Sequence, residues 1–123
     1  MKLRFRENGL RLRLNRPEVA RLASGGALEE RVLFPGNTAL SYLLGSAPDS
    51  SPQASFRGGT IRIAAPKDMI EPWAADNSIG IYFDVPAGSA LLKIAIEKDL
   101  ECLDAPPEER DPDAFPRAGK SCG

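Results

Sequence analysis

The sequence predicts a mainly β (α+β) domain, a pseudo-two-fold closed barrel made of two ββαββ repeats with two short helices. The apolar pattern recurs at an offset of 51 residues, so that Leu10-Arg11-Leu12 corresponds to Ile61-Arg62-Ile63. Each copy also carries two hairpin signals with a short helical pattern between them. Because neither four-stranded half can bury a face alone, we expect the halves to interlock as one barrel.

The repeat runs without a gap over about forty residues. At the far end of each copy the offset still aligns apolar residues, as with Leu28 and Ile79. We therefore expect repeats at residues 2–44 and 53–96, and a single barrel domain over residues 1–100.

The first hairpin is predicted from strict alternation. Apolar and basic residues alternate over 2–6 and again over 10–14, on both sides of Asn8-Gly9. Asn-Gly is the dipeptide most typical of a two-residue hairpin turn. Gly59-Thr60 occupies the equivalent position in the second copy and also suits a two-residue turn.

A short helix is expected after each first hairpin. Asn15 can cap the first helix, Glu18 completes a capping box, and Gly25-Gly26 ends it. The second copy offers an apolar face that includes Ile70, but Pro72 limits this helix to a short piece.

Two further strands close each copy. They are more continuously apolar than the first pair, as expected where both faces are partly covered. Their expected bounds are 28–34 and 38–44 in the first copy, and 79–85 and 90–96 in the second.

One run of the second copy reads Gly59-Thr60-Ile61-Arg62-Ile63-Ala64-Ala65-Pro66-Lys67-Asp68, followed by Ile70 and Ile79-Gly80-Ile81. This run resembles the swapped-hairpin barrel of AbrB-type and MazE-type transcription factors. The resemblance covers roughly residues 2–97 and implies two fused units whose hairpins interlock. It also implies DNA binding through basic residues around the N-terminal hairpins. The whole chain, with its Glu97-Lys98-Asp99-x-x-Cys102-Leu103 stretch, is similar to a small uncharacterised bacterial family, which implies no activity.

The arginines of the two first hairpins are the candidate site. A turn at Asn8-Gly9 would place Arg6 opposite Arg11 and Arg4 opposite Arg13, and a turn at Gly59-Thr60 would place Arg57 opposite Arg62. Paired guanidinium groups suit phosphate, and a β-ribbon can enter a DNA major groove. The candidate nucleic-acid- or anion-binding residues are therefore Arg4, Arg6, Arg11, Arg13, Arg57 and Arg62. The alternative is a solvated face whose arginines pair with nearby carboxylates.

Residues 101–123 form an acidic, proline-rich C-terminal tail. Net charge is +3 over residues 1–50 and −4 over the rest of the chain. Three interpretations stay open: a solvated tail, a tail that covers the chain's own arginines, and a protein-binding tail. The last resembles the acidic segment with which MazE-type antitoxins wrap a toxin. Leu103 and Phe115 are the expected anchors if the tail docks.

The chain has no histidine, which removes the usual general base, His-containing catalytic triads and His metal ligands. Cys102 and Cys122 are weak metal candidates, because a zinc site would need two further ligands. We therefore predict no catalytic residues, no metal ligands and no cofactor.

We predict a non-enzymatic binding module, a DNA- or polyanion-binding regulator that uses paired arginines. The alternative is a protein-interaction or antitoxin-like module that acts through its acidic tail. A third class is a small-ligand or metal site on the barrel rim at Glu97, Lys98 and Asp99. No apolar segment has the length of a signal peptide or a membrane helix, which predicts a cytoplasmic protein without membrane partners.

Overall fold

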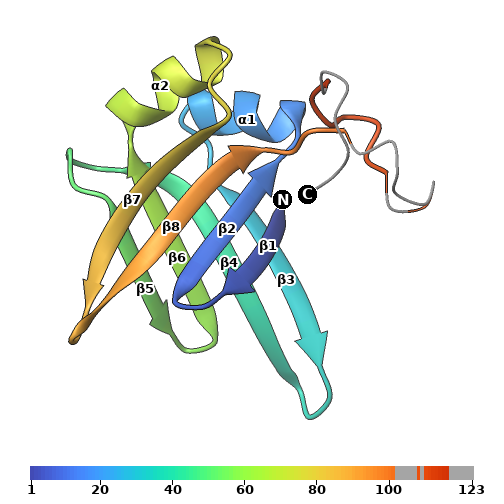
Figure 1. The fold of residues 1–123 in the computed structure, drawn as a ribbon. Coiled ribbons are helices and arrows are strands. Elements are labelled where there is room, and N and C mark those ends of the chain that lie inside the picture. Colours follow the sequence, from blue (N-terminus) through green and yellow to red (C-terminus); the bar gives the residue numbers. More distant parts are fainter. Residues whose placement is uncertain (102–107, 109, 117–123) are drawn as a thin grey trace.

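A computed structural model describes residues 1–101, 108 and 110–116, which form eight strands and two helices (Figure 1). In chain order these are β1 (Lys2–Arg6), β2 (Gly9–Leu14), α1 (Arg16–Ala23), β3 (Leu28–Phe34), β4 (Thr38–Ala47), β5 (Gln53–Arg57), β6 (Thr60–Pro66), α2 (Lys67–Ala75), β7 (Gly80–Ala87) and β8 (Ala90–Lys98). The predicted mainly β class, with two short helices, is confirmed.

Each sheet takes one hairpin from each half of the chain. The first sheet has the order β1-β2-β8-β7, and the second sheet has the order β3-β4-β6-β5. In the first sheet, the β1-β2 hairpin joins the β7-β8 hairpin through a parallel pairing of β2 with β8. In the second sheet, β4 and β6 make the equivalent parallel pairing. The two halves are therefore intertwined, because neither sheet exists without both.

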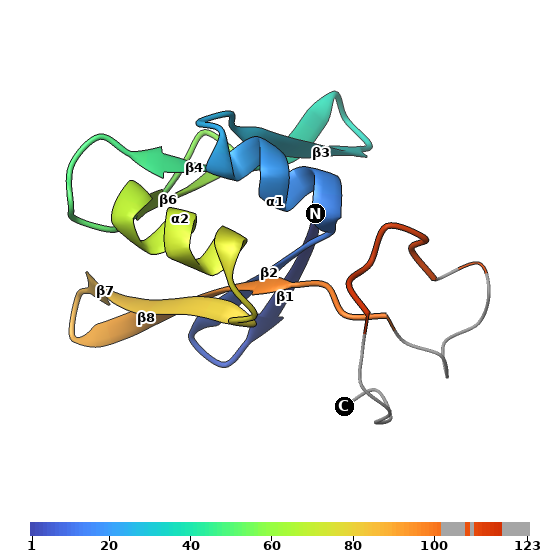
Figure 2. The same cartoon turned by 90° about the horizontal axis from the view of Figure 1, so that it is seen from above.

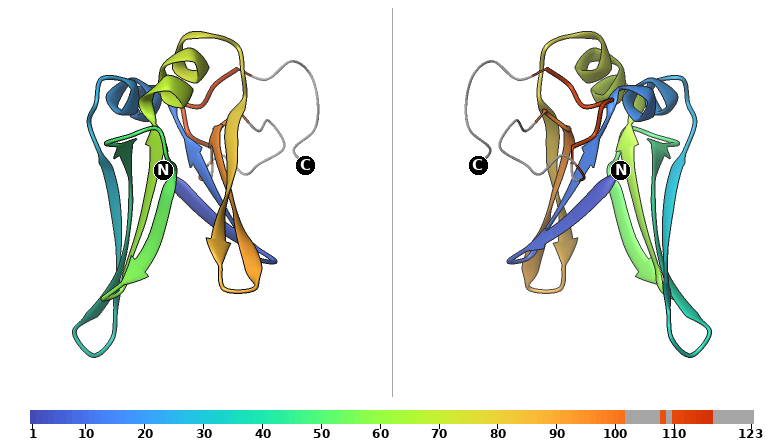
Figure 3. Two further views of the ribbon diagram at one scale, coloured as in Figure 1. Left: turned by 90° about the vertical axis from the view of Figure 1, so that its left-hand side faces the viewer. Right: turned by 90° about the vertical axis from the view of Figure 1, so that its right-hand side faces the viewer.

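The closed barrel that the sequence predicts is not confirmed. To close a barrel, the edge strands of the first sheet, β1 and β7, would have to pair with the edge strands of the second sheet, β3 and β5. Among the described residues, no strand of the first sheet pairs with a strand of the second. Figure 3 shows the sheets diverging from the helices toward the hairpin tips. The sheets meet through side chains instead of backbone hydrogen bonds, so the edge strands stay open.

The core lies between the two sheets at the end covered by the helices. Figure 2 shows α1 and α2 side by side over this end. Alternation directs every second residue of each strand inward, and near the helices these inward residues are removed from water. The buried apolar side chains of both sheets and both helices form one cluster, which includes Leu12, Leu14, Leu22, Leu44, Ile63, Ile70, Trp73 and Ile96.

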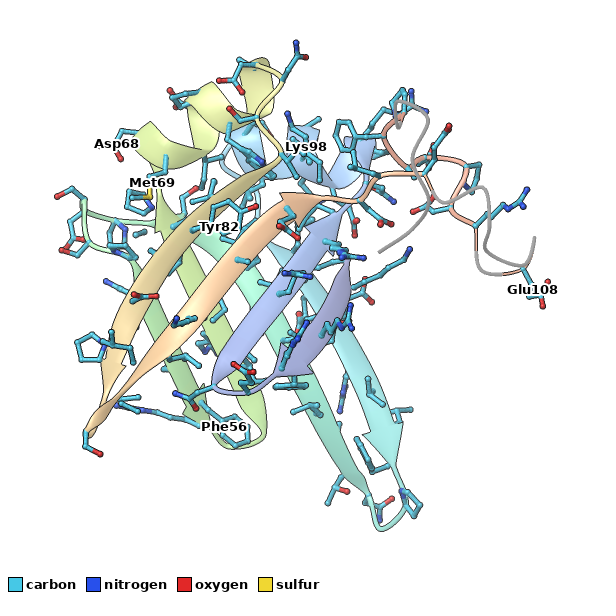
Figure 4. All side chains as sticks on the ribbon, in the orientation of Figure 1. Phe56, Asp68, Met69, Tyr82, Lys98 and Glu108 are labelled. Atoms are coloured by element: carbon cyan, nitrogen blue, oxygen red, sulfur yellow. The ribbon has the colours of Figure 1, made fainter. Side chains whose placement is uncertain are left out.

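Toward the hairpin tips, the inner faces of the sheets become exposed. Phe5 on β1 is 60% exposed and Phe56 on β5 is 67% exposed, and both continue the inward-facing rows of their strands. Figure 4 shows Phe56 near the β5-β6 tip, at the end away from the helices. Apolar burial is therefore concentrated at one end of the molecule.

The gap-free repeat holds through β2, β6 and the helices but is wrong beyond them. Leu28 is buried on β3, whereas Ile79, its expected counterpart, is 51% exposed and precedes β7. Ile81 instead occupies the buried position, since it pairs with Ile96 as Leu28 pairs with Leu44. The offset changes because α2 has nine residues and α1 has eight, and because the turn between β3 and β4 (35–37) is one residue longer than the turn between β7 and β8 (88–89).

Part of the C-terminal tail packs on the domain. The Phe115 amide donates a 2.7 Å hydrogen bond to the Asp99 carbonyl, and the Arg16 amide donates a 3.0 Å bond to the Asp113 carbonyl. Ala114 is buried, and Phe115 packs against the core cluster, which confirms its predicted role as an anchor. Leu103, the other expected anchor, lies outside the described residues.

Candidate anion-binding face

The first hairpin turns one residue earlier than the sequence predicts. Its turn is Glu7-Asn8, so Arg4 lies opposite Arg11 and Arg6 lies opposite Gly9. The expected pairs Arg6/Arg11 and Arg4/Arg13 are therefore wrong.

Contacts with β8 hold this shifted turn. The Asn8 side-chain amide donates a 2.8 Å hydrogen bond to the Leu91 carbonyl, and the Lys93 amide donates a 3.0 Å bond to the Asn8 carbonyl. Gly9 lies against β8, where an added Cβ would stand 3.2 Å from the Lys93 carbonyl oxygen. Glu7 adopts a φ of 53° as the chain reverses.

The second hairpin shifts in the same direction. Its turn is Gly58-Gly59, and both glycines have positive φ, as a type I′ turn requires. Arg57 consequently lies opposite Thr60, and Arg62 lies opposite Ser55. The predicted Arg57/Arg62 pair is wrong, because a turn one residue earlier changes every cross-strand partner.

The two groups of arginines point away from each other. Leu12 and Ile63 face the core from β2 and β6, so the arginines next to them face outward. Arg11 therefore lies on the outer face of the first sheet, and Arg62 lies on the outer face of the second. The two-fold barrel predicted from the sequence would set the arginines of the two hairpins side by side, and this expectation is wrong.

The outer face of the first sheet gathers most of the basic side chains. Arg4 and Arg6 from β1 share it with Arg11 and Arg13 from β2. The parallel pairing of Gly9 with Lys93 adds a lysine from β8 that sequence reasoning missed. No local signal in the sequence marks Lys93, because its place depends on pairing between distant strands. We call these residues the basic face: Lys2, Arg4, Arg6, Arg11, Arg13 and Lys93.

Glu97 organises one end of the basic face. Its Oε1 atom lies 3.1 Å from Arg11 Nε and 3.9 Å from Arg13 Nε. Its Oε2 atom accepts a 2.6 Å hydrogen bond from the Tyr82 hydroxyl. Partial burial of its hydroxyl, together with this hydrogen bond and the charge of Glu97, raises the pKa of Tyr82 to about 12. Glu97 thus orients the tyrosine and partly neutralises two arginines.

Of the six side chains of the basic face, three have no ion pair with any residue that the structure describes. Lys2 is not among them, since its Nζ atom lies 2.7 Å from Asp99 Oδ2. The three are Arg4, Arg6 and Lys93, and all are exposed.

A groove of about 470 Å³ crosses the basic face. Gly9 and Ala95, the two smallest outward residues of the central strands, form its floor. Its lining includes Arg4, Arg6, Arg11, Tyr82, Asp84 and Lys93. Figure 4 shows Tyr82 on β7 beside β8. The volume falls within the range of small-molecule sites, and the lining contributes an excess of positive charge.

The rim residues Glu97, Lys98 and Asp99 do not converge on one site. Glu97 faces outward, whereas Lys98 faces inward and donates a 2.7 Å hydrogen bond to the Asp76 carbonyl. The Lys98 ammonium lies 5.8 Å from the ring centre of Trp73 and 5.6 Å from that of Phe115, which indicates cation–π contacts. No cluster of three acidic or cysteine ligands occurs among the described residues, and Cys102 and Cys122 lie outside them.

The fold and this face define a class of protein: a mainly β, two-sheet domain with a grooved basic surface. The chain belongs to a family of unknown function, DUF7009, which it matches over residues 1–119. No curated protein and no solved structure matches the chain. Within the described residues, no helix is long and apolar enough to cross a membrane.

Proposed function

We propose that this protein is a non-enzymatic module that binds a phosphate-bearing polyanion, such as DNA, on its basic face. The observation that carries the proposal is the position of Arg4, Arg6 and Lys93 around one groove, each without an ion pair among the described residues. Unpaired like charges on neighbouring strands destabilise a sheet. An anionic ligand would remove this repulsion.

The chemistry of the groove suits phosphate. Guanidinium groups bind phosphate oxygens in a bidentate fashion, and a lysine adds a point charge. The ion pair of Arg11 uses its Nε atom, so its terminal nitrogens remain as donors beside the groove. Arg11 can therefore contact Glu97 and a phosphate at the same time.

The outer face of the second sheet provides an experimental control for the basic face. Arg57 and Arg62 lie on the outer face of the second sheet, opposite the groove. Removing these two charges changes the net charge of the protein without touching the basic face. An effect specific to the first sheet therefore separates a site from general attraction between the protein and a polyanion.

The test compares two variants by fluorescence anisotropy with labelled oligonucleotides and heparin over a range of salt concentrations. We expect affinity to fall as salt rises, because bound phosphates release counterions. In Arg4→Ala/Arg6→Ala/Lys93→Ala, the slope of log affinity against log salt should become shallower by roughly two to three, about 0.7–0.9 for each lost cation. Arg57→Ala/Arg62→Ala should keep the wild-type slope. Equal losses in both variants, or no salt-dependent binding by the wild type, would overturn the proposal.

A further inference from the structure

We infer that the groove on the basic face takes single-stranded nucleic acid, with one base stacked on Tyr82 and the neighbouring phosphates on Arg4 and Arg6. This inference rests on the proposed function and names its ligand class. It depends on three features of the first sheet: the way its central strands pair, the two rows of side chains that cross its outer face, and the exposed ring of Tyr82.

The pairing of the central strands disfavours insertion into duplex DNA. The major groove is about 12 Å wide and admits a two-stranded ribbon. Here β2 is hydrogen-bonded to β8, so the β1-β2 hairpin is part of a four-stranded sheet. Four strands spaced about 4.8 Å apart, with long side chains on them, are too wide for that groove. The arginines of the second hairpin lie on the opposite side of the molecule and cannot contact the same duplex face.

Two rows of side chains cross the outer face. One row runs Tyr82, Ala95, Arg11, Arg4, and the adjacent row runs Asp84, Lys93, Gly9, Arg6. The two smallest residues stand in the middle of the rows and leave the floor of the groove open. An aromatic side chain therefore lies at one side of the groove and arginines lie at the other.

Tyr82 is suited to stacking. Its ring lies over Gly80, where an added Cβ would stand 2.6 Å from the hydroxyl oxygen, and the side chain is still 59% exposed. Its hydroxyl is held by Glu97 at 2.6 Å, which fixes the ring on the sheet before any ligand arrives. Because the ring is already ordered, stacking costs the tyrosine side chain little further conformational entropy. Stacking also accepts any base.

The spacing of the arginines suits an extended strand. Arg4 and Arg6 are two residues apart on β1, which corresponds to about 6.7 Å along a strand. Successive phosphates of an extended single strand are separated by a similar distance. Arg4 and Arg6 can therefore contact adjacent phosphates while the base between them reaches across Gly9 and Ala95 toward Tyr82.

The experiment measures binding of a short oligothymidylate, a duplex and heparin to the full chain at matched salt. We expect the single strand to bind more tightly than the duplex. Tyr82→Leu should weaken single-strand binding roughly tenfold and leave heparin binding unchanged, because only the base needs the ring. Tyr82→Phe should retain most of the affinity, since the ring remains. Phe56→Leu removes an aromatic ring that is 67% exposed and does not line the groove, and it should have no effect.

A second readout does not depend on the stability of the leucine variant. In Tyr82→Trp, the new indole should be quenched by oligothymidylate and not by heparin, while Trp73, which is buried, contributes a constant background. The inference fails and the proposed function survives under three joint results. The triple alanine variant of the basic face loses binding, Tyr82→Leu binds the single strand as tightly as the wild type does, and the duplex binds as tightly as the single strand. If no polyanion binds, both fail.

Discussion

Glu97 is the residue on which the geometry of the basic face depends most. Its two carboxylate oxygens contact two arginines from β2 and one tyrosine from β7, while its own strand, β8, lies between them. The side chain is 14% exposed, so its interactions are less screened than those of a surface carboxylate. A single carboxylate thus links three of the four strands of the first sheet.

Ionisation of Tyr82 reports on this carboxylate. We predict that Tyr82 titrates near pH 12, about two units above the ordinary value of 10.0. Because the folded pKa is raised, its contribution to stability is complete below pH 10 and is lost as pH rises through about 12. Absorbance of tyrosinate during a pH titration measures it.

Glu97→Gln should lower this pKa, because the negative charge is lost while the burial remains. Tyr42 serves as the internal control. Its pKa is raised by burial and then by Glu30 and Glu18, so Glu97→Gln should leave it unchanged. A Glu97→Gln variant in which both tyrosines titrate as in the wild type would show that Glu97 does not set the pKa of Tyr82.

Among the elements, α1 is the one whose beginning is best defined. The Asn15 side chain accepts from the Glu18 amide, and the Glu18 side chain accepts from the Asn15 amide, which completes a capping box. The side-chain Nδ2 of Asn15 also donates a 3.0 Å hydrogen bond to Asp111 Oδ2 in the C-terminal tail. By contrast, Pro66 begins α2 without any side-chain cap. One asparagine therefore both begins a helix and holds the tail.

We predict that Asn15→Ala lowers the free energy of unfolding by roughly 1–2 kcal/mol, through loss of the cap and of the bond to Asp111. Urea denaturation followed by circular dichroism measures the change. Asn15→Ser retains a capping oxygen and should lose less. Equal stability of the alanine variant and the wild type would contradict the role assigned to this cap.

Asp111 makes the same contact sensitive to acid. The Asn15 side chain, followed by the Asp113 amide, lowers the pKa of Asp111 below its ordinary 3.8. Because the folded pKa is lowered, this stabilisation is present above about pH 4 and is lost as pH falls through the folded pKa. In Asp111→Asn, stability between pH 4 and 2 should depend less steeply on pH than in the wild type. Parallel pH profiles for the two proteins would rule out this contribution.

At the scale of the whole molecule, stability depends on both halves together. The first sheet needs β8 beside β2, and the second needs β6 beside β4. The core cluster correspondingly draws on both hairpins of both halves and on both helices. A half alone would expose the inner faces of two separate hairpins, and a two-stranded hairpin is marginal by itself.

We therefore predict that residues 1–48 expressed alone do not form a folded monomer. The fragment should be unfolded, or it should dimerise by letting its two hairpins take the places of those in the missing half. Circular dichroism with light scattering distinguishes these states. A cooperative, folded monomer of this fragment would contradict the dependence of each half on the other.

Side-chain direction and helix capping were determined by the sequence itself. Alternation alone places Leu12 inside and Arg11 outside, and Asn15 with Glu18 marks the start of α1. These properties are local, because a strand has a period of two residues and a cap joins residues three positions apart. The two short helices and the mainly β class follow from the same patterns.

Only the tertiary structure decided which residues share the site. Asn8 binds β8 and moves the hairpin turn, and the parallel β2-β8 pairing brings Lys93 and Glu97 beside the arginines. The same topology places Arg62 on the other outer face and leaves the two sheets open. These outcomes depend on pairing between strands about eighty residues apart. A pattern with a period of two residues states which way a side chain points, but it does not state which strand lies next to it.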